Sequence, residues 1–136
     1  MRILGIDYGD ARVGVAISDP LGFMATELPQ IAGGNMDLVC AEIQKIIDEY
    51  RVERIVLGYP KNMNGSIGPR GELSEQFKEL LEKKTGIAVV LWDERLTTVS
   101  ATYLMNETNV RGKKRKSRLD SLSAALILEN YLRTLG

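Results

Sequence analysis

The sequence predicts a single α/β domain in which a five-stranded mixed sheet is flanked by helices on both faces. Three short apolar runs separated by turn residues come first, and they predict three strands. After them, segments with helical spacing alternate with further apolar runs, which is typical of parallel strands joined by helices. A chain of 136 residues is the size of one domain, and no repeat or linker divides it, so residues 1–136 are expected to fold as one unit.

The first three strands are expected at Ile3–Ile6, Val13–Ile17 and Phe23–Ile31. The first run is apolar throughout, as in a strand buried on both faces, and the second follows closely enough to be its hairpin partner. Asp7 stands at the carboxyl end of the first strand, just before the turn residue Gly9. Ligands and catalytic groups of α/β sheets gather at that edge, so an acid in this place predicts a function.

The middle of the chain predicts two amphipathic helices on either side of a fourth strand at Arg54–Gly58. Asn35 is a suitable N-cap for the first helix, with Cys40 expected close to its apolar face. Pro69 suits the first position of the second helix, which Gly86 is expected to end. The apolar positions of the first helix are Leu38, Val39, Ile43, Ile46, Ile47 and Tyr50, and those of the second are Leu73, Phe77, Leu80 and Leu81.

The last third of the chain predicts one more strand and two more helices. The fifth strand is expected at Ile87–Trp92 and is followed at once by acidic residues. A short helix is expected from Thr97 or Thr98 to about Glu107, and a final helix from Ser117 to about Leu135.

The composition excludes several kinds of chemistry. The chain has no histidine and a single cysteine, which excludes a histidine general base and an internal disulfide and argues strongly against a zinc site. Catalysis would therefore have to use carboxylates, lysine, hydroxyl groups or a metal ion bound through oxygen. No apolar stretch approaches the ~20 residues that span a bilayer, so we expect a cytoplasmic protein with no membrane contact.

Acids that follow two different strands are the strongest chemical signal. Asp7 follows the first strand and Glu94 the fifth, and both reach the same edge of the sheet if those strands are parallel. Two strand spacings are about 10 Å, so side chains that lean inward can share one ion. Carboxylate oxygens select hard cations such as Mg2+ or Mn2+. Asp120, in the first turn of the expected final helix, is a third candidate ligand.

Each acid also has a purely structural interpretation. Asp7 can be a turn residue, and Glu94 can pair with Arg95 or with a neighbouring base on the surface. Asp120 fits a capping box that begins at Ser117, where the helix dipole favours a carboxylate. Asp93, next to Glu94, is an alternative or additional metal ligand.

A basic strip between Arg111 and Arg118 is the second signal. Six of the 18 basic residues lie in it without any acid, so the rest of a neutral chain is acidic. Phosphate groups are the obvious counterions for such a strip, which would contact a nucleic-acid backbone without reading its sequence. A solvated loop is the alternative, as it is for the polar residues Lys61 and Asn62 after the fourth strand.

Several motifs in order along the chain resemble those of the YqgF/RuvX family. They are Gly5-Ile-Asp-Tyr-Gly9, Arg12-Val-Gly-Val-Ala-Ile-Ser-Asp-Pro20, Gly58-Tyr-Pro-Lys-Asn-Met63, Gly65-Ser-Ile-Gly-Pro69, Trp92-Asp-Glu-Arg-Leu-Thr-Thr98 and Lys113-Lys-Arg-Lys116 before Asp120. Members of this family are nucleases of pre-16S rRNA that were also described as Holliday-junction resolvase-like. The resemblance implies a ribonuclease H-like fold and a metal-dependent nuclease of the bacterial cytoplasm that matures the 5′ end of 16S rRNA.

The resemblance implies an acidic set of Asp7, Glu94 and Asp120, the same three residues that the strand ends and the final helix suggest. Tyr59 is a minor departure, since the family more often has leucine there. The main hypothesis is metal-assisted phosphodiester hydrolysis in which these acids hold one or two Mg2+ or Mn2+ ions. Contacts with the nucleic-acid backbone are assigned to Arg12, Asn62, Arg95, Lys113, Lys114, Arg115 and Lys116.

Three other functions remain open. The first is a DNA junction resolvase, which would act as a dimer. The second is a nucleic-acid-binding module without catalysis. The third is a phosphate or nucleotide binder, because an Asp-x-Gly hairpin also opens the actin and sugar-kinase ATPases, although these need two lobes. The expected partner is pre-16S rRNA or structured DNA, and the expected state is a monomer or weak homodimer.

Overall fold

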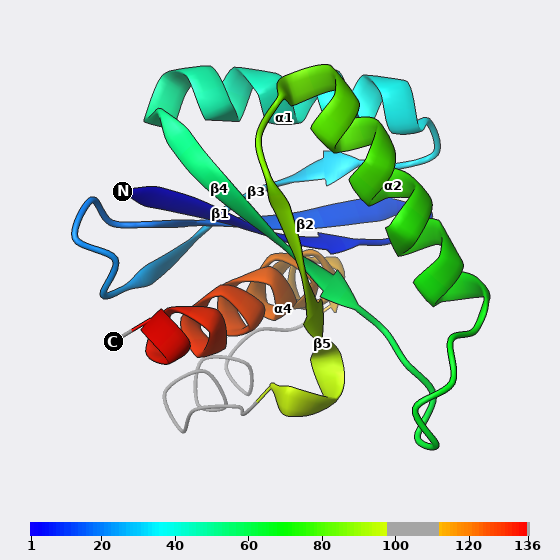
Figure 1. Cartoon of the computed structure of the whole chain (residues 1–136). Helices are drawn as coiled ribbons and strands as arrows, with labels where there is room; N and C mark the ends of the chain where they lie inside the picture. The colour runs from blue at the N-terminus through cyan, green and yellow to red at the C-terminus, as the bar shows by residue number, and fades with distance from the viewer. Residues whose placement is uncertain (98–111, 136) are drawn as a thin grey trace.

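The protein is a five-stranded sheet between two layers of helices, with α1 and α2 on one face and α4 on the other (Figure 1). The structure, a computed structural model, describes residues 1–97 and 112–135, with side chains throughout except in 112–121. The strands are β1 (Arg2–Tyr8), β2 (Arg12–Ser18), β3 (Ala25–Ala32), β4 (Val52–Tyr59) and β5 (Val89–Asp93). The helices are α1 (Met36–Tyr50), α2 (Pro69–Thr85), the short 3-10 helix η1 (Glu94–Leu96) and α4 (Gly112–Leu135).

The sheet is mixed and has the strand order β3-β2-β1-β4-β5. The hairpin β1–β2 and the pair β2–β3 are antiparallel, whereas β1 pairs with β4, and β4 with β5, in parallel. The carboxyl ends of β1, β4 and β5 therefore meet at one edge, with β4 between the other two. The first and fifth strands are therefore parallel, which is the condition under which Asp7 and Glu94 were expected at one edge.

Strand alternation divides the core in two. Leu4 and Ile6 of β1 face α1 and α2, where Phe77 and the buried Cys40 also pack. Ile3 of β1 packs against the buried face of α4 on the other side of the sheet. Gly5 lets α4 come close to β1, because a Cβ at Gly5 would lie 2.8 Å from the Leu128 Cβ. Odd-numbered residues of β1 therefore face α4, and the next of them after Gly5 is Asp7.

Local hydrogen bonds explain most of the expected element boundaries. Asn35 caps α1 through its side chain, which accepts from the Leu38 backbone N–H, and α2 begins at Pro69 and ends before Gly86, as predicted. The third strand begins at Ala25 rather than Phe23, because the Asp19 carboxylate accepts from the backbone N–H groups of residues 23 and 24 and keeps them in the preceding turn.

The fifth strand is shorter than expected at its start. It begins at Val89 rather than Ile87, because the Ile87 N–H donates to the Thr85 hydroxyl and so stays with the end of α2. The Val89 N–H in turn donates to the Glu82 carboxylate of α2. These two hydrogen bonds hold the start of β5 against the end of α2.

Two expectations about the helices are wrong, and a third concerns residues outside the described part of the chain. The final helix begins at Gly112, not Ser117, because lysine and arginine favour helix and extend it towards its start. Leu38 was expected on the apolar face of α1 but is 65 % exposed. The short helix expected from Thr97 or Thr98 to about Glu107 falls almost wholly outside the described residues.

Among the described helices, none is long and apolar enough to cross a membrane.

Candidate active site

Asp7 lies in the last part of β1, where the strand pairs with Gly14 of β2. It is a strand residue and not a turn residue, so the turn interpretation is wrong. Its carboxyl group is half-buried on the α4 side of the sheet, by the alternation that places Ile3 and Gly5 there.

Glu94 reaches the same place from two strands away. The residue opens η1, immediately after β5, and its side chain passes over Gly58 of β4. A Cβ at Gly58 would lie 3.2 Å from the Glu94 Cδ and 2.8 Å from the Ile127 Cδ1 of α4. The glycine therefore keeps open the path by which Glu94 crosses β4 towards Asp7.

The side chains of Glu94 and Asp7 lie within hydrogen-bonding distance of each other. Burial raises the pKa of Glu94 above its usual range, and the neighbouring charge of Asp93 acts in the same direction. Arg70 and the contact with Asp7 oppose this rise only in part. Two acids held together in a partly desolvated place repel each other when both are ionised, unless a cation is bound between them.

The donor set fits a hard divalent cation. Asp7 and Glu94 offer only carboxylate oxygen, which Mg2+ and Mn2+ prefer, and their side chains are close enough to bind one shared ion. Within the described side chains, no group of three acids, cysteines or histidines forms a complete cage. A third ligand would have to come from elsewhere in the chain.

Asp120, the third expected ligand, lies in α4, and its side chain falls outside the described part of the structure. The residue stands one helical turn before Ala124, whose backbone packs on Gly5 of β1. Because α4 begins at Gly112, Ser117 and Asp120 lie within the helix, and the capping-box interpretation is wrong.

Asp93 has a different role from Glu94. Its carboxylate accepts from the Arg95 guanidinium through Nε at 3.1 Å and through NH2 at 2.7 Å, and also from the Arg95 backbone N–H. These contacts hold the pKa of Asp93 below its usual range. Arg95 therefore pairs with Asp93, and the alternative interpretation in which Glu94 pairs with Arg95 is wrong.

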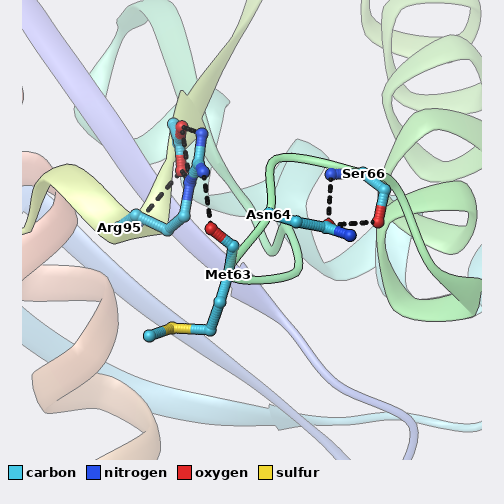
Figure 2. A network of polar contacts seen from close by, with 5 residues as sticks. Met63, Asn64, Ser66 and Arg95 are labelled. Atoms are coloured by element: carbon cyan, nitrogen blue, oxygen red, sulfur yellow. Dashed lines mark hydrogen bonds and ion pairs between the residues drawn. The ribbon is translucent and has the colours of Figure 1, made fainter.

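Arg95 also fixes the loop that follows β4. Figure 2 shows its guanidinium reaching the backbone carbonyl of Met63, with an N···O distance of 3.5 Å. In the same loop, the Asn64 side chain accepts from both the backbone N–H and the hydroxyl of Ser66. The Asn62 side chain donates to the Ser66 hydroxyl, so both asparagines order this loop. Asn62 and Arg95 thus have structural partners beside the candidate site.

The remaining expected nucleic-acid contacts are only partly described. Arg12 opens β2 opposite Ala32 of β3 and is half-buried. Lys61 lies with its ammonium group 5.4 Å from the centre of the Tyr59 ring. The backbone of the basic strip from Lys113 to Lys116 forms the beginning of α4, and its side chains lie outside the described part of the structure.

Sequence analysis missed two residues of this site, Gly58 and Arg70. Gly58 was noted as the end of a strand and as part of a family motif but not as a site residue, although a glycine there signals a close approach by another group. Arg70 follows Pro69, which was correctly expected to begin a helix. A helix that begins just after the loop from β4 places its first residues near the acidic edge. The position of Pro69 could therefore have predicted that Arg70 lies near the site.

Comparison with known proteins gives a consistent result over nearly the whole chain. The sequence model of a family described as "RuvX: Holliday junction resolvase" matches residues 1–134. A protein of Clostridium botulinum (strain Alaska E43 / Type E3) named "Putative pre-16S rRNA nuclease" is 49 % identical over 132 residues, which cover 97 % of this chain and 96 % of its own. A protein of the same name from Listeria monocytogenes serotype 4b (strain CLIP80459) is 48 % identical over 136 residues, which cover 98 % of this chain and 99 % of its own.

Solved structures with this fold include two resolvases. RuvC of Thermus thermophilus superposes with a TM-score of 0.60 at 13 % identity, over 98 % of this chain and 96 % of its own. The fowlpox virus Holliday junction resolvase has a TM-score of 0.54 at 13 % identity, over 98 % of this chain and 99 % of its own. These likenesses confirm the predicted ribonuclease H-like fold.

Proposed function

This chain belongs to the RuvX family, and from that membership and the acids at its sheet edge we propose that it is a divalent-metal-dependent nuclease. The observation that carries the proposal is the contact between Asp7 and Glu94, made across Gly58 from two different strands. Two carboxyl groups that lie this close together at the edge of a sheet are suited to hold a cation. Asp120 is proposed as the third ligand.

The proposed substrate is the 5′ end of pre-16S rRNA. Relatives that are 48–49 % identical over nearly their full length carry the name of a pre-16S rRNA nuclease. This substrate implies action in the bacterial cytoplasm, and a single copy of the domain, or a weak homodimer, would be enough to cut one RNA strand.

Each residue of the site has a defined part in the proposed reaction. Asp7 and Glu94 hold Mg2+ or Mn2+ through their oxygen atoms, and the rigid end of β1 and the η1 turn fix the direction of both side chains. When bound, the ion supplies positive charge that favours attack by water and stabilises the leaving oxygen. Gly58 keeps the crossing open for Glu94, and burial beside α4 keeps bulk water from weakening the interactions of the carboxylates.

The nucleic-acid backbone is proposed to lie along the same edge. Arg12, Asn62, Arg95 and the basic residues Lys113, Lys114, Arg115 and Lys116 are the assigned contacts. Arg95 would contribute mainly by holding the loop after β4 in a fixed shape, as its bonds to Asp93 and Met63 indicate. Replacement of the four basic residues by glutamine should weaken binding at low salt, and unchanged affinity would contradict this assignment.

A DNA junction resolvase is the second candidate. The family description names Holliday junctions, and RuvC of Thermus thermophilus in complex with a junction superposes with a TM-score of 0.62 at 13 % identity. At that identity the likeness shows the fold and not the substrate. Symmetrical cutting of a junction would also need a stable dimer.

One cleavage experiment separates these candidates. A 5′-extended 16S precursor RNA and a DNA four-way junction are incubated with the wild-type protein and with Asp7→Asn, in Mn2+ or in EDTA. Metal-dependent cleavage of the RNA that Asp7→Asn abolishes supports the proposed function. Preference for the junction supports the resolvase. Binding of both substrates without cleavage contradicts both and indicates a binding module.

A further inference from the structure

Arg70 is positioned at the sheet edge by tight packing at the beginning of α2. A Cβ at the next residue, Gly71, would lie 3.0 Å from the Pro60 carbonyl oxygen and 2.7 Å from the Ile67 Cγ2. The first turn of the helix therefore packs directly on the loop that leaves β4. In Figure 1 that loop runs from the arrowhead of β4 into the beginning of α2. Arg70 is thus held close to the carboxyl ends of the parallel strands.

Among the described residues, the Arg70 guanidinium has no close ionic partner. Arg95 is paired with Asp93, and Lys61 lies over the Tyr59 ring. Within residues 1–97 and the described side chains of α4, no hydrogen bond or ion pair of the Arg70 guanidinium is found. Arg70 is exposed, and its positive charge acts electrostatically on Glu94. Arg70 is therefore available to an anion that approaches the candidate site.

A pocket of about 190 Å³ lies next to Arg70. Its other walls are Leu73 of α2 and the end of the first strand with its turn, Tyr8, Gly9 and Asp10. The Tyr8 ring stacks on Phe77 with 4.5 Å between ring centres, which fixes this wall against α2. Asp7 faces α4 whereas Tyr8 faces α2, so the pocket and the carboxyl pair lie on opposite sides of one strand end.

We propose that Arg70 binds a phosphate of the substrate strand next to the one that is cleaved, with this pocket receiving that phosphate and part of its sugar. The strand would cross the edge of the sheet between α4 and α2, and its cleaved phosphate would lie at Asp7 and Glu94. Arg70 is then a positioning residue that fixes the register of cleavage. This inference rests on the proposed function for the cleaved phosphate, but the phosphate contact itself does not require catalysis.

Asp10 provides a second test of the proposal, in which the expected change in affinity has the opposite sign. Its carboxylate lines the same pocket, is exposed, and forms no ion pair with Arg70 among the described contacts. A phosphate in the pocket would be repelled by Asp10 and attracted by Arg70. The two residues should therefore change affinity in opposite directions, which a purely structural role of either would not produce.

The experiment measures binding of the 5′-extended 16S precursor RNA in EDTA, where no cleavage occurs, over a range of salt concentrations. Arg70→Gln should weaken binding about tenfold at low salt and reduce the slope of log K against log salt by about one. Arg70→Lys should restore part of the affinity, and Asp10→Asn should increase it. Lys83→Gln is the matched control, because it removes one exposed positive charge about 20 Å further along the same helix.

Cleavage in Mn2+ then separates this inference from the proposed function. If the protein cleaves RNA, Arg70→Gln should raise KM more than it lowers kcat, since a contact to a neighbouring phosphate acts mainly on binding. If the protein binds RNA without cleaving it, a reduced salt slope in Arg70→Gln still supports the phosphate contact. The inference is overturned if Arg70→Gln and Lys83→Gln have the same affinity and salt slope, or if Asp10→Asn weakens binding as much as Arg70→Gln does.

Discussion

Asp93 and Glu94 are adjacent acids at the end of β5, and they lie in opposite electrostatic surroundings. Asp93 accepts hydrogen bonds from three N–H groups of Arg95, and its pKa is lowered. Glu94 packs against another acid, and burial raises its pKa. One carboxylate is neutralised within the protein, whereas the other lacks a close positive partner among the described residues.

This difference separates a structural acid from a functional one. The pair of Asp93 with Arg95 holds the loop after β4 through the Met63 carbonyl, and it needs nothing from outside the protein. The pair of Asp7 with Glu94 places two acids together at a cost in free energy that a bound cation would remove. Carboxylate-to-amide substitutions at these positions should therefore have contrasting effects.

The largest effect is expected from Asp7→Asn and Glu94→Gln. Each should reduce metal-dependent cleavage by more than about 100-fold, because even residues behind a metal ligand commonly account for 10–100-fold. Neither should lower the unfolding temperature, since each removes one of two like charges. The measurements are initial cleavage rates in Mn2+ and thermal unfolding in EDTA. Loss of activity that is matched by unfolding at the assay temperature would contradict this account.

Gly58→Ala should have the next largest effect. The new methyl group would collide with Ile127 and press on Glu94, so we expect a loss of about 1–3 kcal/mol in stability and a loss of about tenfold or more in cleavage. Gly5→Ala is the matched control, because its Cβ would lie 2.8 Å from the Leu128 Cβ without touching Glu94. Equal losses of activity in the two variants would show that displacement of Glu94 is not the cause.

The smallest effect is expected from Asp93→Asn, and it should depend on pH. Because Arg95 lowers the pKa of Asp93, the stabilisation is fully present above the ordinary aspartate value of about 3.9 and is lost as pH falls through the lower folded-state value. At pH 7 the variant should unfold a few degrees earlier than the wild type, since the pair is partly exposed. The difference should shrink at acid pH, and a constant difference from pH 7 to pH 2 would argue against the ion pair.

Much of this fold could be predicted because its signals are local. Asn35 marks a helix start through its side-chain cap and Pro69 through its fixed backbone angle, and the apolar runs around Ile3–Ile6 and Arg54–Gly58 identify buried strands. Boundaries were less accurate where a polar side chain a few residues away accepts a hydrogen bond from the backbone, because apolar periodicity does not report such bonds. The Asp19 carboxylate delays the third strand, and the Thr85 hydroxyl delays the fifth.

The candidate site could be predicted only in part, because sequence gives strand ends but not the path of a side chain. The strand ends were enough to place Asp7 and Glu94 at one edge, on the condition that the first and fifth strands are parallel. The crossing over Gly58 depends on a space created by three elements together, β4, η1 and α4. The choice of Arg95 between Asp93 and Glu94 depends on the η1 turn, for which the sequence offers no periodic signal.

Mn2+ binding to the wild type, Glu94→Gln and Asp93→Asn tests the central claim most directly. The loss of the electron paramagnetic resonance signal of free Mn2+ measures the bound ion without any need for substrate. The account predicts that Asp93→Asn binds Mn2+ like the wild type, whereas Glu94→Gln binds it at least about tenfold more weakly. Unchanged binding by Glu94→Gln, or loss of binding in Asp93→Asn alone, would show that the metal site does not lie between Asp7 and Glu94.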